Sequence, residues 1–135
     1  MKFIIPGTPV AKGRPRLGKF GTYTPKKTVQ YENLVQLAYM EQVNMPPTDK
    51  ALDMEIKLYF PIPKSYTKKK KEDISAGKLK FTKKPDLDNC MKTICDALNG
   101  IAYIDDSQIY QVAIYKAYAV EPEMPRAEVI ITEIN

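Results

Sequence analysis

The segment from Pro85 to Gln108 constrains this chain more than any other, because it combines a helical period with five aspartates. Its apolar residues recur at the three- and four-residue spacing of one helix face, and Asn99-Gly100 provides a helix end. Opposite that face, Asp88, Lys92 and Asp96 lie four residues apart and share one side of the helix. The spacing predicts a helix over residues 86–99 with an apolar stripe made of Leu87, Met91, Ile94, Cys95 and Leu98.

The distribution of charge sets this segment apart. Residues 1–84 hold 18 Lys and Arg against 7 Asp and Glu, a net charge of +11, whereas residues 85–135 hold 3 against 9, a net charge of −6. A basic surface attracts a polyanion, but clustered carboxylates repel one unless a divalent cation lies between them. Metal-dependent chemistry on a nucleic acid explains both halves of the chain.

The length and composition indicate one domain over residues 1–135, with a hydrophobic fraction of 44% that suffices for one core. No apolar run approaches the roughly 18 residues that cross a bilayer, and no leader peptide opens the chain. We therefore expect a cytoplasmic protein with no membrane partner. Cys90 and Cys95 are separated by about 140° around the predicted helix, so a disulfide between them is not expected.

Two absences narrow the chemistry further. The chain has no histidine, which excludes histidine-dependent nucleases, Ser-His-Asp triads and zinc deaminases. It also lacks the glycine-rich loops that bind nucleoside phosphates and dinucleotides, so we expect no nucleotide cofactor. Carboxylate, lysine, tyrosine and metal-bound water remain as the reacting groups.

The other predicted elements are one further helix and four strands. Thr24 is the expected N-cap and Pro25 the first residue of a helix that extends to about Asn44. Its apolar stripe is predicted to be Val29, Leu34, Val35, Ala38 and Tyr39. The strands are predicted at residues 2–5, 52–60, 108–118 and 126–134, from alternating or strand-forming residues between turns.

Two basic segments lie between these elements. The first, around residues 11–19, is either a solvated loop or hairpin or an arm that contacts phosphates, and its arginines favour the arm. The other segment, residues 64–84, leads directly into the aspartates, so it can hold a phosphate backbone against them. The residues expected to bind DNA are Lys12, Arg14, Arg16, Lys68, Lys69, Lys70, Lys71, Lys83 and Lys84.

The aspartates also have structural interpretations. Asp86 can cap the helix, Asp88 can pair with Lys92, and Asp105-Asp106 can form a turn. Helix capping needs only one acidic residue, however, so it does not explain both the Asp86–Asp88 pair and the Asp105–Asp106 pair. The second pair reaches the helix start only if residues 100–104 double back, and five extended residues span about 16–18 Å against roughly 20 Å for a 14-residue helix. Carboxylates gathered there would need Mg²⁺ or Mn²⁺, with Lys92 beside them to stabilise charge on a phosphodiester.

These motifs resemble the RusA family of Holliday junction resolvases. The resemblance is carried by Lys-Pro-Asp-Leu-Asp-Asn at 84–89, Lys92, Cys-Asp-Ala-Leu at 95–98 and Asp-Asp-Ser-Gln at 105–108. It implies that Asp86, Asp88 and Asp106 are the metal-binding catalytic carboxylates and Lys92 the catalytic lysine. Asp105 is included in the metal site only as the second member of its pair. Family members often have arginine before the first aspartate, where this chain has Lys83-Lys84-Pro85, so the sequence preference for cleavage does not transfer.

The resemblance also implies the architecture and activity. The expected fold is a small α/β (α+β) domain with a mixed β-sheet packed by two main helices, which forms a homodimer. The expected activity is Mg²⁺-dependent, with Mn²⁺ as a substitute, and introduces paired symmetric nicks into four-way DNA during recombination and repair. The protein would be prokaryotic or encoded by a phage or prophage. Two alternatives stay open: a non-catalytic DNA-junction binding protein, and another metal-dependent phosphoryl-transfer enzyme such as a nucleotidyltransferase.

Overall fold

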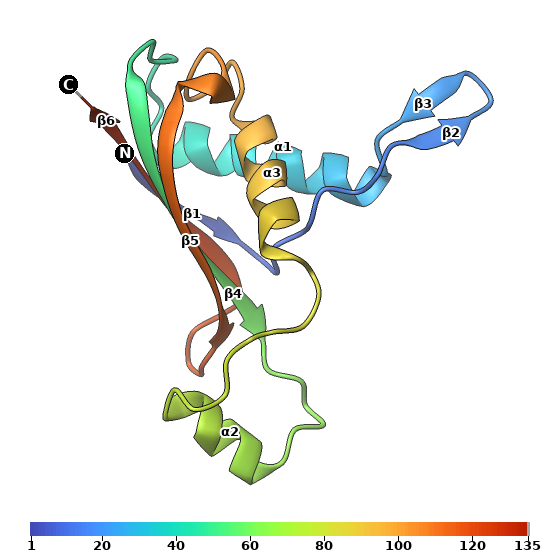
Figure 1. Ribbon diagram of the computed structural model, residues 1–135, viewed down its shortest axis with the longest axis vertical. Coiled ribbons are helices and arrows are strands. Elements are labelled where there is room, and N and C mark those ends of the chain that lie inside the picture. Colours follow the sequence, from blue (N-terminus) through green and yellow to red (C-terminus); the bar gives the residue numbers. More distant parts are fainter. Residues whose placement is uncertain (135) are drawn as a thin grey trace.

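The computed structural model describes residues 1–134, which form a four-stranded mixed sheet with two helices packed on one face (Figure 1). The strand order is β1-β6-β4-β5, in which β4 and β5 are parallel and the other neighbours antiparallel. The small α+β domain with a mixed sheet packed by two helices is confirmed, and residues 1–134 contain a third α-helix, α2, that lies off the sheet. The main elements are β1 (Lys2–Pro6), α1 (Lys26–Gln42), β4 (Ala51–Pro61), α2 (Lys68–Ser75), α3 (Leu87–Ala97), β5 (Ile109–Ala119) and β6 (Arg126–Ile134).

The parallel pair β4 and β5 determines the layout of the domain. Parallel neighbours cannot be joined by a tight hairpin and need a long crossover. Here the crossover is residues 62–108, which contain α2, α3 and a short 3-10 helix, η1 (Asp106–Gln108). Within it, α3 packs on the sheet beside α1, and α2 lies beyond the far end of β4 (Figure 1).

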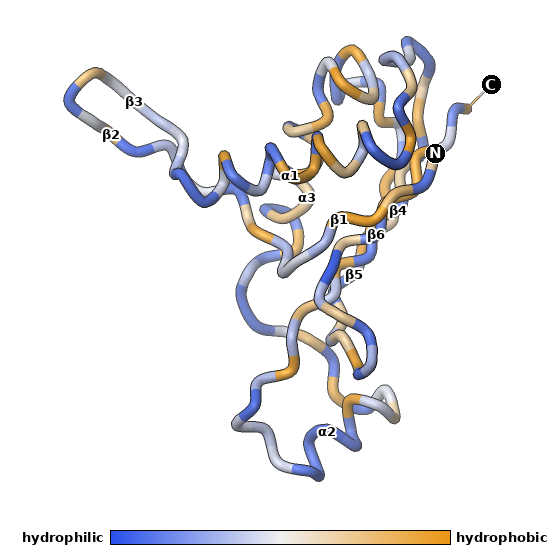
Figure 2. Tube along the Cα trace, turned by 180° about the vertical axis from the view of Figure 1, so that it is seen from behind, coloured by the Kyte–Doolittle hydropathy of each residue, from blue (hydrophilic) through white to orange (hydrophobic). Residues whose placement is uncertain are grey.

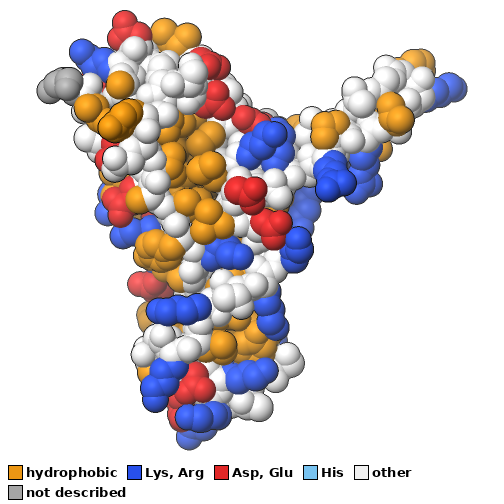
Figure 3. Space-filling model, viewed as in Figure 1, with side chains coloured by type: hydrophobic (Ala, Val, Ile, Leu, Met, Phe, Trp, Pro, Cys, Tyr) orange, Lys and Arg blue, Asp and Glu red, His pale blue; other side chains and the backbone are white. Residues whose placement is uncertain are grey.

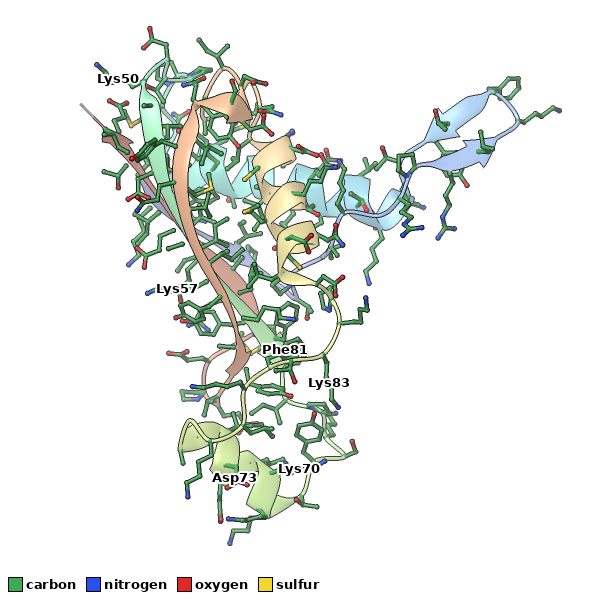
Figure 4. All side chains as sticks on the ribbon, viewed as in Figure 1. Lys50, Lys57, Lys70, Asp73, Phe81 and Lys83 are labelled. Atoms are coloured by element: carbon green, nitrogen blue, oxygen red, sulfur yellow. The ribbon has the colours of Figure 1, made fainter. Side chains whose placement is uncertain are left out.

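The core forms between the sheet and helices α1 and α3. In β4 the alternating residues 52, 54, 56, 58 and 60 are all 2% exposed or less, which confirms the strand predicted from their period of two. Together with apolar residues of β1, β6 and both helices they make one cluster. The other face of the sheet carries Lys57 and Tyr59 and stays partly open to solvent, and Figure 4 shows Lys57 on the side away from the helices.

Helix α1 differs from its prediction in start and in orientation. It begins at Lys26, and Pro25, not Thr24, occupies the N-cap position without a side-chain cap. Val29 is 42% exposed, while Thr28 and Tyr31 are buried instead. One residue rotates a helix by about 100°, and the Thr28 hydroxyl faces the neighbouring loop, where it accepts a hydrogen bond from the Gly13 backbone N–H at 3.0 Å. A polar residue with a backbone partner therefore takes the inner position.

The sequence analysis did not predict helix α2. Its first four residues are lysines and only Ile74 is buried, so it has almost no apolar period. The Thr67 hydroxyl caps the helix by accepting from the Lys70 backbone N–H at 3.2 Å. A capped lysine run thus forms a basic helix at the end of the sheet.

The first basic segment forms a hairpin of β2 (Arg16–Gly18) and β3 (Gly21–Tyr23). It is a separate two-stranded sheet that projects from the domain (Figures 1 and 2). Gly21 has a φ of +114°, which a side chain would disfavour, at the turn between the strands. The segment therefore forms a hairpin, and its role as an arm that contacts phosphates stays a prediction.

Both cysteines are free and buried. Burial raises the pKa of the Cys95 thiol to about 12, and the nearby charges of Asp106 and Asp96 act in the same direction. The Cys95 thiol points at the Met54 sulfur, 3.8 Å away in the core. No helix among the described residues is both long and apolar enough to cross a membrane.

The Cys95 thiol should make stability depend on pH in the alkaline range. An unfolded thiol titrates near a pKa of about 8.5, whereas the folded chain keeps its proton until about pH 12. The unfolded state therefore releases a proton first, and the free energy of unfolding should fall as the pH rises above about 9. Urea unfolding of wild type and Cys95→Ala at pH 8 and pH 10 measures this, and the variant should lose less stability across that interval. Equal losses in both proteins would contradict the assignment.

Candidate functional site

Asp86 and Asp88 lie at the start of α3, but their side chains do not cap it. Asp86 occupies the N-cap position with extended backbone and makes no side-chain cap hydrogen bond. Its carboxylate instead lies 3.2 Å from the Lys84 ammonium. Asp88 is exposed in the first turn. The capping interpretation therefore leaves both carboxylates unexplained.

A lysine on β5 holds the segment that leads to Asp86. The Lys116 ammonium donates to the backbone carbonyls of Lys83 at 2.9 Å and Pro85 at 3.0 Å. The same ammonium lies 5.2 Å from the centroid of the Phe81 ring, which stacks on Phe60 at 4.4 Å. Figure 4 shows Phe81 against the end of the sheet with Lys83 close by. The approach to the carboxylates is thus fixed to the sheet by a charged and an aromatic contact.

Lys12 connects three parts of the domain instead of facing solvent. Its ammonium lies 3.1 Å from Glu32 on α1 and 3.2 Å from Asp96 on α3, and its backbone N–H donates to the Asn89 carbonyl at 2.9 Å. Burial alone would lower the pKa of Lys12, but the hydrogen bonds to Glu32 and Asp96 raise it. Because two carboxylates already neutralise this lysine, we leave it out of the proposed DNA contacts.

Lys92 is exposed on the helix turn that follows Asp88. The surface ion pair considered for these two residues is not formed, since no contact of 4 Å or less joins their charged groups in residues 1–134. Both charges therefore stay accessible from solvent. Their arrangement on one side of α3 agrees with the spacing in the sequence.

The second pair of aspartates divides into a cap and a less constrained carboxylate. The Asp105 side chain accepts from the Ser107 backbone N–H at 3.1 Å and caps η1. Hydrogen bonding from the Ser107 side chain, and then from its backbone N–H, lowers the pKa of Asp105. The Gln108 side chain accepts from the backbone of Ile104 and Asp105 and donates to the carbonyls of residues 48 and 50. The turn interpretation thus accounts for Asp105, and Gln108 fixes the backbone that carries Asp106.

The two pairs lie toward different ends of α3, because residues 100–104 do not double back along the helix. Those residues make a tight turn in which the Gly100 N–H donates to the Tyr103 carbonyl at 2.7 Å. Buried Tyr103 then donates its hydroxyl to the carbonyl of Cys95, near the end of the helix. The 11-residue helix is about 16 Å long. Within residues 1–134 no three His, Cys, Asp or Glu side chains are placed to share one metal ion.

The electrostatics of the two cysteines reflect the same separation. Burial is the largest cause of the raised pKa of both thiols. Among the acidic groups, Asp86 and Asp88 raise the pKa of Cys90, whereas Asp106 and Asp96 raise the pKa of Cys95. The Asp86–Asp88 pair alone still fits a magnesium ion. Mg²⁺ takes one or two protein carboxylates and completes its shell with water and phosphate oxygens.

Basic surfaces lie on both sides of these carboxylates. An open groove of about 700 Å³ has Pro85 at one side and Arg14, Arg16 and Lys27 among its other lining residues. On the opposite side, the Tyr66 ring has two lysine ammonium groups, from Lys70 and Lys83, 4.7 and 5.1 Å from its centroid. Figure 3 shows acidic side chains over α3, with basic side chains toward the hairpin and toward α2. All of the basic residues predicted to bind DNA are exposed except Lys12, which is partly buried.

Comparison with known proteins places this arrangement in a family. The model of the family described as "Endodeoxyribonuclease RusA" matches residues 6–132. The chain belongs to the RusA family. A curated relative, the Bacillus subtilis (strain 168) protein named "Uncharacterized protein YqaN", is 39% identical over 141 residues, which cover 100% of this chain and 97% of the relative. The RusA family comprises divalent-metal-dependent endodeoxyribonucleases that bind branched DNA and resolve Holliday junctions.

The sequence analysis missed the role of Lys116. It is the one basic residue of β5, between apolar and aromatic neighbours, and that isolation was the available signal. Lys27, which lines the groove, was also missed, because it lies inside a predicted helix. Neither residue belongs to the aspartate motifs.

Replacing Lys116 by Met should reduce cleavage more than DNA binding. The variant keeps the aliphatic stem but leaves the carbonyls of Lys83 and Pro85 without their charged donor, at a cost of about 1–3 kcal/mol in stability. We expect the single-turnover cleavage rate on a RusA-family substrate, a four-way junction, to fall at least about tenfold, with junction affinity changing less. Lys57→Met, on the open face of the sheet, is the matched control. Wild-type cleavage by Lys116→Met would show that this anchor does not position the site.

Proposed function

We propose that this protein is a Mg²⁺-dependent endonuclease that resolves four-way DNA junctions by paired symmetric nicks. The proposal rests on one observation. Asp86 and Asp88 are exposed at the start of α3, between two basic surfaces, and their side chains do not cap the helix. Membership of the RusA family supports the reaction class. The finer statements about metal, residues and assembly are our inference.

Asp86 and Asp88 would hold the ion, with Mn²⁺ as a possible substitute. A divalent ion at this position supplies an acidic water and positive charge near the scissile phosphodiester. Lys92 follows Asp88 by one helical turn, so its ammonium can stabilise charge on the phosphate or give a proton to the leaving oxygen. Asp106 enters the proposal through the family resemblance alone, because it lies toward the other end of α3 from Asp86 and Asp88. Asp105 acts as the cap of η1.

Lys84 would exchange partners on binding DNA. In the free protein it pairs with Asp86 at 3.2 Å, and both side chains are more than half exposed. A cation at Asp86 would compete for that carboxylate and release the lysine ammonium. The released charge lies next to the expected path of the phosphate backbone.

The basic surfaces would align the DNA across the carboxylates. Arg14, Arg16 and Lys27 line the groove beside Pro85, and their exposed forks and ammonium suit phosphate oxygens. Residues 68–71 of α2 and Lys83 form the basic surface on the other side. Each phosphate contact adds about 0.9 to the slope of log affinity against log salt, so binding should weaken steeply with salt.

A homodimer follows from the symmetry of the proposed reaction. Two opposed cuts in a four-way junction call for two sites related by a two-fold axis. One chain supplies one pair of carboxylates at α3. The second site would come from the second copy.

One observation favours a second candidate, a DNA-junction binding protein without nuclease activity. In residues 1–134 no three carboxylates are gathered around a single metal position, and Asp105 is engaged as a cap. This candidate predicts junction binding that needs no divalent ion and leads to no cleavage. The Asp88→Asn variant separates the two functions.

Asp88→Asn should abolish cleavage and leave junction binding equal or tighter. The substitution keeps the shape of the side chain but removes the charge that would hold the ion, and it also removes repulsion of DNA phosphate. Cleavage of a labelled four-way junction in Mg²⁺ should fall at least about a hundredfold, while the dissociation constant in EDTA should not rise. Asp53→Asn, the same change on the open face of the sheet, should cleave normally. Full cleavage activity of Asp88→Asn would contradict the proposed role of this carboxylate.

A further inference from the structure

The β2–β3 hairpin presents apolar side chains to solvent. Phe20 is 97% exposed at its turn and Leu17 is 87% exposed on β2. Figure 2 shows the hairpin extending away from the sheet, with hydrophobic colour at its tip. A two-stranded hairpin alone is only marginally stable in water, so this element gains little from its own packing. Its composition points to a binding partner.

The charge around the hairpin selects the kind of partner. Residues 1–31 contain seven Lys and Arg and no Asp or Glu. On the hairpin itself the Lys19 ammonium lies 5.8 Å from the centroid of the Phe20 ring, and Arg16 is exposed on β2. An acid-free surface of this kind attracts a polyanion and repels the same segment of a second copy. A nucleic acid fits both its charge and its exposed aromatic ring.

The hairpin is also continuous with the candidate active site. The groove beside Pro85 is lined by Arg14 and Arg16, and Arg16 is the first residue of β2. A phosphate backbone that reaches Asp86 along this groove therefore arrives at the base of the hairpin. The hairpin tip projects beyond this groove, away from the sheet (Figure 2).

We propose that Phe20 stacks on the base pair that is exposed at the branch point, and so selects branched over linear DNA. The inference rests on the proposed function, because it takes junction DNA as the substrate. Aromatic rings stack on bases of any sequence, and apolar side chains insert where base steps are already open. A continuous duplex offers no such open face. Phe20 would therefore add affinity for the junction without adding affinity for linear DNA.

The test compares Phe20→Ala and Phe20→Trp with the wild type in EDTA, so that binding is measured without cleavage. The probes are a four-way junction with the fluorescent base aminopurine at its branch point and a linear duplex with the same base at its centre. Wild type should change the fluorescence of the junction probe only. Phe20→Ala should lose that change and bind the junction about tenfold more weakly, with duplex affinity unchanged. Phe20→Trp should restore both properties of the junction complex.

Three results would overturn the inference. In the first, Phe20→Ala changes the fluorescence of the junction probe as much as wild type does. In the second, the variant loses equal affinity for junction and duplex. In the third, the free variant shifts from dimer to monomer while the fluorescence change of the junction probe is kept. The last would assign the hairpin to a contact between copies. Cleavage assays in parallel keep the two proposals apart. If wild type shows the signal but cuts in no divalent ion, the nuclease proposal fails and the stacking role stands. If wild type cuts and Phe20→Ala is indistinguishable from it, only the stacking role fails.

Discussion

The parallel pairing of β4 with β5 is the constraint on which the rest of this structure depends. Parallel neighbours need a long connection, and residues 62–108 provide it. That connection carries α2, the Asp86–Asp88 pair, α3 and the Asp105–Asp106 turn. The sheet is therefore a scaffold, and most of the candidate chemistry lies in one crossover that leaves the end of β4 and returns to the start of β5 (Figure 1).

A long crossover holds a site in place only where it is tied to the scaffold. Lys116 bonds the backbone before Asp86, and Phe81 stacks on Phe60 at the end of β4. At the other end, the Gln108 side chain accepts from the backbone just before the η1 turn and donates to the Thr48 carbonyl ahead of β4. These anchors fix the crossover near each pair of aspartates. Side chains outside the acidic motifs thus determine where the acidic motifs lie, which is why a motif alone does not describe the site.

The sequence predicted the parts of this fold that depend on local period. The alternation in residues 52–60 and the apolar stripe of α3 follow from burial on one face, and both occur in the structure. Helix α2 was not predictable from period because Ile74 is its one buried residue. The site was partly predictable. Sequence spacing placed Asp88 and Lys92 on one side of α3, but the anchor at Lys116 depends on contacts between distant segments, which no local pattern records.

We propose that this crossover makes the protein a junction-selective, metal-dependent nuclease. The most direct measurement incubates the purified wild-type protein with an end-labelled four-way junction and a linear duplex of matched sequence, in Mg²⁺, Mn²⁺ or EDTA. We expect paired nicks at symmetric positions in the junction, with either metal ion, and none in EDTA or in the duplex. Tight junction binding without cleavage in any ion would contradict it and assign the aspartates a structural role.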